Sequence, residues 1–359
     1  MIPRNISKSD ILRAMKKIDT EGIPKGRKSS KYSISYMGVL YPPKLVISYA
    51  NLFANYEELA PANFSGGKEV NGFLSHLGFR IIGPEIDEFD EVTSCNDINI
   101  SCITIQSYDS ASNEIRFKAL FDIVSQVGTN SDVILLPAGF FNTTKKANFL
   151  YKDIEYKVSK QLKNLDLDTI VCLGIDGRNN KEKLSKDQIA LAINKKGIIS
   201  IARKFYPTNE EADYIEKANH YLSLESDYSR IIHVKDKKLY LAICYDGFGI
   251  RKQCLENPNV DGILNLVHGF YPHGLAGSGE VYFAKYSFAG SSRQWNCPTF
   301  GASIFFDRII PDKFPTGVLW TQGDKSVQQW KYSDNGMKTS KMVSLSIGEE
   351  RAVVNTYSI

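Results

Sequence analysis

Residues 239–246, which read LYLAICYD, decide the fold assignment of this chain. The segment begins as a strand-like run, and Cys244 follows at the point where the strand is expected to end. Upstream, a second strand-like run at 198–202 leads into Lys204. The sequence therefore places a thiol and an ammonium group at the ends of two separate predicted strands.

The length of 359 residues suits two domains, or one large domain with an appendage. No run approaches the roughly 18 apolar residues that a membrane helix needs, and the N-terminus lacks the apolar region of a secretory signal. Six cysteines are scattered without paired spacing, which indicates reduced thiols rather than a disulfide framework. These features predict a cytoplasmic protein that does not contact a membrane.

Basic residues concentrate in the first part of the chain. Residues 1–84 hold twelve Lys and Arg against six Asp and Glu, a local excess of +6, whereas the remainder holds thirty-two against thirty-four. A small basic module on a near-neutral body can contact nucleic acid. A solvated basic face without any partner explains the same charge equally well.

The first module has a distinctive order of turns and helices. Tyr41-Pro-Pro-Lys44 precedes a predicted helix at 45–55, Phe64-Ser-Gly-Gly67 predicts a turn, and a short helix is predicted at 70–77. This pattern resembles the small head domain at the N-terminus of some McrA-type restriction endonucleases and related phage-defence proteins. The resemblance covers residues 1–84 and implies a small α+β head domain, for which DNA contact is a hypothesis.

Residues 85–97 carry six acidic residues and no apolar period, which predicts a linker. From residue 98 onward, strand and helix patterns alternate. Strand-like runs lie at 98–105, 133–136, 169–174, 188–193, 198–202, 239–243, 262–267 and 299–306, and helices are predicted at 114–127, 147–165, 209–222 and 280–295. An alternation of this kind argues for an α/β fold in which helices cover the sheets.

The Lys and Cys segments resemble the motifs of the nitrilase (carbon–nitrogen hydrolase) superfamily. Family members read roughly strand-Ile-Cys-Tyr-Asp, which this chain matches through Asp246, and the hairpin before Lys204 resembles the strand-turn-strand of the family. The resemblance covers residues 98–359 and implies a nitrilase-like α-β-β-α sandwich whose subunits form a homo-oligomer. It also implies that Cys244 is the nucleophile and that Lys204 holds the oxyanion, together with the backbone N–H of Tyr245.

The third catalytic residue of that family, a Glu just after a Pro, has no counterpart in this chain. The matching segment, residues 134–141, reads ILLPAGFF, so Ala138 stands at the Glu position. A methyl group cannot accept the thiol proton, and loss of a general base typically costs on the order of 10²–10⁴ in rate. Three explanations are open. Glu was replaced by Ala to trap a ligand, the protein binds without turnover, or another carboxylate (Glu210, Glu211 or Asp246) acts as the base.

Two further side chains are candidates for substrate contact. Glu211 lies at a predicted helix start, in a region where many family members carry a second Glu that orients the lysine or the substrate. The alternative is a charge that complements the helix N-terminus. His268 follows the strand at 262–267, in a segment that shapes the substrate pocket of the family, and an ordinary loop is the alternative. No metal-like spacing and no nucleotide loop occur, so the sequence predicts neither a metal site nor a cofactor.

We therefore expect a hydrolase that cleaves a non-peptide C–N bond of a small amide or nitrile through a Cys thiolate, in a bacterial defence context. Because Ala138 replaces the catalytic Glu, we expect the chain to be inactive or to trap its ligand. The alternative is a non-catalytic nitrilase-like binding or assembly module whose head domain contacts nucleic acid.

Overall fold

The computed structural model divides the chain into two compact units, Met1–Val92 and Thr93–Ile359, which we call the head and the body. It describes residues 2–3, 5–29, 32–36, 39–77, 79–82, 97–107, 111–178, 185–218, 228–272, 279–321, 329–331, 337–347 and 350–359. The acidic segment 85–97, predicted to be a linker, lies outside these residues except for Asp97. No helix among the described residues is long and apolar enough to cross a bilayer.

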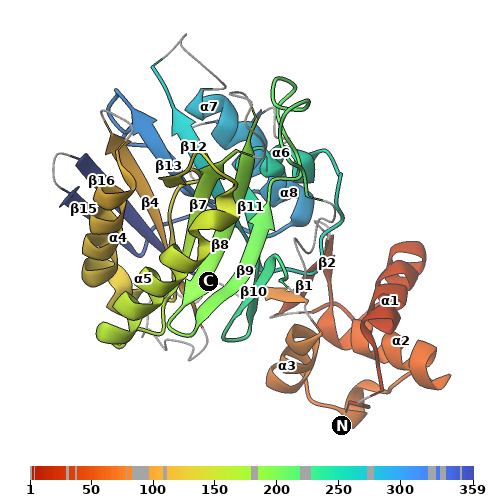
Figure 1. Cartoon of the computed structure of the whole chain (residues 1–359). Coiled ribbons are helices and arrows are strands. Elements are labelled where there is room, and N and C mark those ends of the chain that lie inside the picture. Colours follow the sequence, from red (N-terminus) through yellow and green to blue (C-terminus); the bar gives the residue numbers. More distant parts are fainter. Residues whose placement is uncertain are drawn as a thin grey trace. The chain divides into compact units, whose positions relative to one another are not determined.

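The head is a small α+β unit, coloured red to orange in Figure 1. Its elements are α1 (Lys8–Glu21), β1 (Ser33–Tyr36), β2 (Val39–Tyr41), α2 (Pro43–Asn55), a 3-10 helix (Pro61–Asn63), α3 (Lys68–His76) and β3 (Arg80–Ile82). The three strands form an antiparallel sheet in the order β2-β1-β3. A capping box starts α1, because the side chains of Ser7 and Asp10 each accept the backbone N–H of the other. Apolar residues of all three helices form the core, among them Ile11, Met15, Leu45, Val46, Val70 and Leu74.

The body alternates strands and helices. Its strands are β4 (Asn99–Ser107), β5 (Val133–Leu135), β6 (Phe141–Asn142), β7 (Ile170–Gly177), β8 (Asp187–Asn194), β9 (Gly197–Arg203), β10 (Ile231–Val234), β11 (Lys237–Ile243), β12 (Gly262–Phe270), β13 (Thr299–Phe306), β14 (Gly317–Val318), β15 (Lys341–Ile347) and β16 (Glu350–Ser358). Its helices are α4 (Asn113–Val127), α5 (Tyr151–Asn164), α6 (Asp246–Arg251), α7 (Glu280–Phe283) and α8 (Gly290–Trp295). A π-helical segment, Ala284–Ala289, joins α7 to α8, and 3-10 helices lie at Gly128–Asn130 and Ala147–Leu150.

Strand β4 joins the two halves of the sheet, whose order is β10-β11-β12-β13-β4-β5-β7-β8-β9. The first part of β4 pairs in parallel with β5, and its last part pairs in parallel with β13. The other edge of β4 pairs with β16, which runs antiparallel to it. Because β8 and β9 contact β10 and β11, the two halves fold over each other into a sandwich (Figure 1).

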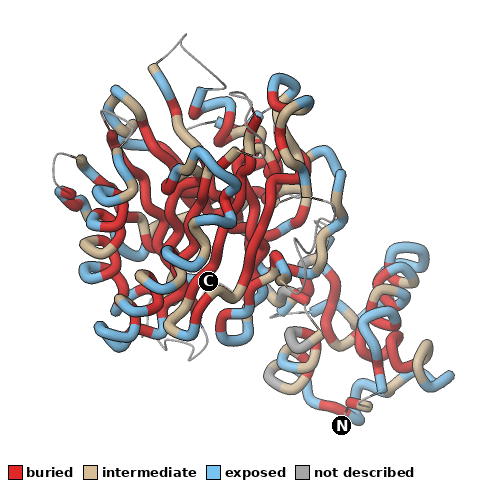
Figure 2. The backbone as a smooth tube through the Cα atoms, in the orientation of Figure 1, coloured by how far each residue is buried: buried red, intermediate tan, exposed pale blue. Residues whose placement is uncertain are grey.

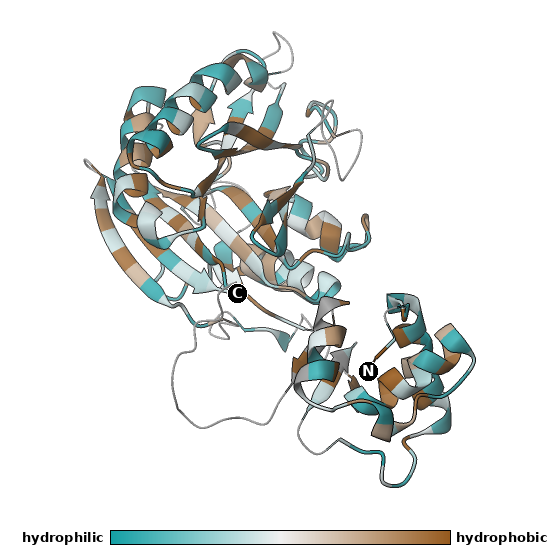
Figure 3. Cartoon of the chain, turned by 90° about the horizontal axis from the view of Figure 1, so that it is seen from below, coloured by the Kyte–Doolittle hydropathy of each residue, from teal (hydrophilic) through white to brown (hydrophobic). Residues whose placement is uncertain are grey.

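Four layers follow from this arrangement. The apolar interior lies between the two halves, where residues such as Cys102, Leu135, Leu241 and Phe300 meet. Helices α4 and α5 cover the outer face of the β5–β9 half, and helices α6 and α8 cover the outer face of the β10–β13 half. Strands with both faces covered are apolar on both sides. Figure 2 shows the strands of the body as its most continuously buried parts, and Figure 3 shows apolar residues running along them. The predicted α-β-β-α sandwich is confirmed.

Two parts of the body differ from the elements expected from the sequence. The helix predicted at 209–222 is wrong over its described part, because none of residues 209–218 is helical, and residues 219–222 lie outside the described residues. Thr208 and Glu211 form reciprocal hydrogen bonds of the capping-box type, but the Glu211 carboxylate also binds Lys204 and holds the segment as turns against the body. The C-terminal hairpin of β15 and β16 was not predicted, although β16 pairs with β4 along most of its length.

Candidate active site

Five strands of the body bring functional side chains to one end of the sandwich. Ala138 follows β5, Lys204 follows β9, and Cys244 follows β11, while Asp176 and His268 lie near the ends of β7 and β12. Strand β9 runs in the same direction as β7, because each of them is antiparallel to β8. The carboxyl ends of the strands are where open α/β sheets bind their ligands.

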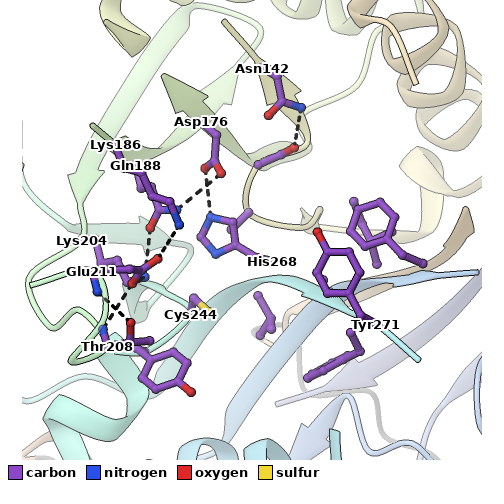
Figure 4. Close-up of a pocket in the computed structure, with 18 of the residues that line it drawn as sticks. Asn142, Asp176, Lys186, Gln188, Lys204, Thr208, Glu211, Cys244, His268 and Tyr271 are labelled. Carbon is purple, nitrogen blue, oxygen red and sulfur yellow. Dashed lines mark hydrogen bonds and ion pairs between the residues drawn. The ribbon is translucent and has the colours of Figure 1, made fainter. Parts of the chain in front are cut away.

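A cavity of about 640 Å³ lies at this end of the body (Figure 4). Its wall includes the six residues predicted to act in catalysis or substrate contact, namely Ala138, Lys204, Glu211, Cys244, Tyr245 and His268. Of the other carboxylates considered as a base, Glu210 lines the cavity and Asp246 does not. The Asp246 carboxylate is fully buried, where it accepts hydrogen bonds from Arg230 at 2.7 Å and from the N–H of Ile243 at 3.0 Å.

Cys244 sits in a strained turn at the end of β11. Its φ of 51° lies in the left-handed region, which costs a non-glycine residue on the order of 1–3 kcal/mol and persists only where the surroundings hold it. Two contacts with β12 do so. The Cys244 N–H donates to the Leu266 carbonyl at 2.7 Å, and the Cys244 carbonyl accepts from the Asn265 amide at 3.1 Å. The turn leaves Cys244 on the cavity wall with 7% of its surface exposed.

The Cys244 thiol lies beside the imidazole of His268 and interacts with it electrostatically (Figure 4). On the other side of the imidazole, Nε2 of His268 lies 2.9 Å from Oδ1 of Asp176. Figure 4 shows the imidazole directed at the Asp176 carboxylate, with Cys244 beside it. Thiol, imidazole and carboxylate therefore stand in one row, which we call the Cys–His–Asp chain (Cys244, His268 and Asp176).

The charges within this chain depend on one another. Burial opposes ionisation of the thiol, but His268, and less strongly Lys204, hold the pKa of Cys244 below its ordinary value. Burial also opposes the imidazolium, but Asp176 and Cys244 raise the pKa of His268 to about 10. The pKa of Asp176 is lowered because His268 and two lysines outweigh its burial. These interactions favour the thiolate, the imidazolium and the carboxylate together.

Lys204 lies on the side of Cys244 away from His268, where two hydrogen bonds hold its ammonium group in place (Figure 4). Its side chain is 1% exposed, and Nζ donates to Glu211 at 2.5 Å and to Gln188 at 2.9 Å. Burial would lower the pKa of Lys204, but Cys244 and Glu211 raise it, so the ammonium stays charged. An ammonium group has three N–H donors. Two are used here, which leaves one for an oxygen of a bound substrate.

The Glu211 carboxylate forms ion pairs with two lysines, which oppose its protonation. One carboxylate oxygen binds Lys204 and the other lies 3.1 Å from Nζ of Lys186. Burial would raise the pKa of Glu211, but these two lysines lower it to about 2. A carboxylate with such a pKa is a poor general base at neutral pH.

The segment after β5 packs against the Cys–His–Asp chain. Ala138 is 2% exposed, and its N–H donates to the carbonyl of Val267 at 3.0 Å. Gly139 has a φ of 61°, and a Cβ there would come within 3.1 Å of Asp176 and 3.2 Å of His268. The imidazole–carboxylate pair therefore lies directly beside the position where the nitrilase family has its Glu.

Sequence reasoning missed Asp176, Gln188 and Lys186. Asp176 lies just beyond the strand predicted at 169–174, because β7 continues to Gly177. The only signal was one acidic residue at the end of an apolar run. Among the described residues, no group of three or more His, Cys, Asp or Glu side chains is arranged to hold a metal ion.

Comparison with known proteins identifies the head. Residues 4–83 match the family model of the ScoMcrA-like N-terminal head domain. This match confirms the head-domain prediction. A search of curated proteins found no match to the chain.

Several solved structures of carbon–nitrogen hydrolases are similar to this chain. A mutant of the amidase from Nesterenkonia sp. AN1, with a Michael adduct of acrylamide at its active-site cysteine, is 9% identical with a TM-score of 0.46, over 72% of this chain and 92% of the amidase. A carbon–nitrogen hydrolase from Helicobacter pylori G27 is 9% identical with a TM-score of 0.46, over 73% and 89%. A glutamine-dependent NAD(+) synthetase from Cytophaga hutchinsonii is 15% identical with a TM-score of 0.39, over 58% and 36%.

The first two are proteins of the kind that the sequence predicted for residues 98–359. Their identities and TM-scores are low, so we infer the chemistry of the site from the residues of this chain alone.

Proposed function

We propose that the body is a cysteine-dependent hydrolase that cleaves a C–N bond of a small amide, with His268 in the role that Glu has in the nitrilase superfamily. The observation that carries this proposal is the Cys–His–Asp chain on the wall of the cavity. A thiolate beside an imidazolium is an activated nucleophile with its proton donor already in place. On this proposal Ala138 does not disable the site, and the protein is active rather than a trap.

The first half-reaction forms a thioester. The Cys244 thiolate attacks the amide carbon, a C–S bond forms, and the carbonyl electron pair moves onto oxygen. The unused N–H of Lys204 and the backbone N–H of Tyr245 are the donors we assign to this oxyanion. The His268 imidazolium gives its proton to the nitrogen, the C–N bond breaks, and ammonia or an amine leaves.

The second half-reaction uses the neutral imidazole. His268 takes a proton from water, and the resulting hydroxide attacks the thioester carbon. The C–S bond breaks, the acid leaves, and Cys244 returns as a thiolate beside the imidazolium. Asp176 acts as a positioning residue, because its carboxylate fixes the imidazole and stabilises its charge in both halves.

Ammonia release from a panel of small amides and nitriles tests this function. We expect release by the protein as it is, none by Cys244→Ala, and a loss on the order of 10²–10⁴ in His268→Asn. Alkylation of Cys244 by iodoacetamide, located by peptide mass spectrometry, reports the thiolate without knowledge of the substrate. If no compound of the panel releases ammonia and iodoacetamide does not alkylate Cys244, a non-catalytic binding module is favoured.

We further propose that the head contacts nucleic acid, in a bacterial defence context that its resemblance to McrA-type proteins supports. A cavity of about 420 Å³ in the head is lined by Arg27, Lys28 and Lys44 together with Tyr32, and no acidic residue is among its described lining residues. Cations positioned in this way bind phosphate backbones. The homo-oligomer expected from the superfamily stays a prediction.

A further inference from the structure

A second cavity, of about 440 Å³, adjoins the candidate active site. It shares Asn142, Asp176 and Lys186 with the first cavity. The remainder of its wall consists of Thr143, Thr144, Gly177, Arg178 and Ser185. The carboxylate that orients His268 therefore lines both cavities, and a molecule bound at Cys244 can extend from one into the other.

The second cavity is cationic. Arg178 is partly buried, and its guanidinium has no hydrogen-bond or ion-pair partner among the described residues. Lys186 supplies a second positive charge, with its side chain 41% exposed. Asp176 is the one acidic residue in the described wall, and its charge is balanced by the His268 imidazolium. A guanidinium without a partner among the described residues, next to a lysine, suits a carboxylate or phosphate group.

Backbone hydrogen bonds hold the walls of this cavity in place. The Thr143 N–H donates to the Asp176 carbonyl at 2.9 Å, and the Arg178 N–H donates to the Lys145 carbonyl at 2.8 Å. The Lys186 N–H donates to the Tyr214 carbonyl at 3.1 Å. Gly177 packs so closely against the backbone at Ala147 that a Cβ at position 177 would lie 2.6 Å from the Ala147 nitrogen. The two cations thus stand on a fixed frame, as a preformed binding site requires.

We propose that the second cavity is an anion subsite, in which Arg178 and Lys186 bind a carboxylate or phosphate group of the substrate while its scissile carbonyl lies at Cys244. This inference rests on the proposed function of Cys244 and narrows the substrate to amides that carry an anionic group. Arg178 is the specificity-determining residue, since Lys186 also holds Glu211 and so supports Lys204.

Chloroacetyl probes that alkylate Cys244 test the subsite without a known substrate. The thiolate displaces chloride and a C–S bond forms, so the rate of alkylation reports how well the attached group is bound. One series joins the chloroacetyl group to glycine, β-alanine and 4-aminobutyrate, which places a carboxylate at increasing distance. A second series carries phosphonates on the same spacers, and a third carries neutral primary amides.

The full chain is compared with Arg178→Gln, with the charge-preserving Arg178→Lys, and with Lys152→Gln, which removes an exposed cation from α5. We expect the ratio of the alkylation rate of an anionic probe to that of its neutral counterpart to be highest at one spacer length. In Arg178→Gln this ratio should fall about tenfold, which corresponds to the loss of one charge-assisted hydrogen bond. The neutral probes should react equally with all four proteins. Arg178→Lys should keep most of the ratio, and Lys152→Gln all of it.

Three outcomes overturn the inference. A ratio that Arg178→Gln leaves unchanged means that the preference for anions comes from Lys204 and His268 alone. No preference for either charged series means that the cavity binds no anion. Failure of the neutral probes to alkylate Cys244 in the unmodified protein overturns the proposed function as well. An Arg178-dependent preference confined to the carboxylates or to the phosphonates decides which group the substrate carries.

Discussion

The Cys244 thiolate and the His268 imidazolium stabilise each other, and this coupling sets the conditions under which the residues of the site can react. A catalytic Glu must take the thiol proton during the reaction, whereas an imidazole in an ion pair has already taken it. Asp176 supports this state, because its carboxylate is hydrogen-bonded to the imidazole. The Cys–His–Asp chain can therefore supply both the nucleophile and the proton for the leaving nitrogen.

We expect the rate at which iodoacetamide alkylates Cys244 to fall less steeply below about pH 8.5 than the rate of an ordinary thiol. The pKa of Cys244 is lowered and that of His268 is raised to about 10, so the ion pair persists between these two values. An ordinary thiol with a pKa of about 8.5 reacts roughly tenfold more slowly for each pH unit below it. Peptide mass spectrometry over a pH series measures the rate. A tenfold rise per unit up to pH 8.5 would contradict the ion pair.

Asp176→Asn is the matched control, since it keeps the shape of the side chain and removes its charge. Without the carboxylate the imidazolium loses support, the pKa of Cys244 rises, and alkylation at pH 6 should fall by up to about tenfold for each unit by which that pKa comes to exceed 6. The rate at pH 9 should change much less. An unchanged pH profile in Asp176→Asn would leave Asp176 a merely structural role.

At this scale the sequence predicted which side chains meet, but not what all of them do. Family resemblance predicted Cys244 and Lys204 as catalytic residues and left His268 open between pocket wall and ordinary loop. The proposed role of His268 depends on its position between Cys244 and Asp176, which brings together residues from the ends of three strands. No local pattern in the sequence reports such a contact, so a lone histidine after a strand reads equally well as pocket wall or loop.

Among the elements, the segment between β5 and β6 decides how the site is built. Its Gly139 approaches Asp176 and His268 closely, and its Ala138 is buried beside them. In a site with a Glu at position 138, that carboxylate would compete with Asp176 for the same cations. The small residues here leave the space to the imidazole and its partner.

We expect Ala138→Glu to weaken the site rather than to restore it. A second carboxylate in this buried region adds like charge next to the Cys244 thiolate and Asp176, which raises the pKa of the thiol. Where the pKa of the thiol exceeds the pH, each further unit of pKa lowers the thiolate population about tenfold. Iodoacetamide alkylation at pH 7 and ammonia release should both fall, by up to about tenfold for each unit by which the pKa comes to exceed 7.

Ala138→Gln separates charge from volume in this test. If crowding alone is responsible, Gln and Glu should slow alkylation equally. If charge is responsible, Gln should cost less. A gain in ammonia release in Ala138→Glu, absent from Ala138→Gln, would contradict the role of His268 and would mean that a glutamate base suits this body.

The elements also show where sequence reasoning succeeds and where it stops. Apolar runs such as β5 and β13 were predicted to within a few residues, because burial on both faces requires a continuous apolar stretch. The end of β7 was set too early, which hid Asp176. The segment 209–218 begins with a capping motif, yet the ion pairs of Glu211 outweigh local helix preference. The pairing of β16 with β4 joins residues more than 240 positions apart, and no local pattern predicts it.

At the scale of the whole molecule, two units with separate cores share one chain. The head has its own apolar core and its own small sheet, and the body has its own interior between the sheet halves. Residues 1–84 carry a net +6, whereas the remaining residues carry −2, from thirty-two basic and thirty-four acidic side chains. Composition and family resemblance sufficed to predict this division. They could not show that Arg27, Lys28 and Lys44 gather around one cavity of the head.

We expect the full chain to bind a short DNA duplex with an affinity that falls as the salt concentration rises, because bound phosphates release their counterions. A Lys28→Gln, Lys44→Gln double variant should bind more weakly. The slope of log affinity against log salt should decrease by about 1 for each phosphate that a lysine no longer neutralises. Fluorescence anisotropy of a labelled duplex over a salt series measures both quantities.

Charge-preserving replacements provide the control, because Lys44 also packs over Phe64 and donates to the Pro61 carbonyl at 3.0 Å. Lys28→Arg with Lys44→Arg should keep the salt slope, whereas a loss shared by the Arg and Gln variants would indicate disturbed packing of the head. Alkylation of Cys244 should proceed equally in all three proteins, since its reactivity depends on residues of the body. Binding that is insensitive to salt, or unaffected by the Gln variant, would mean that these lysines form a solvated basic face with no nucleic-acid partner.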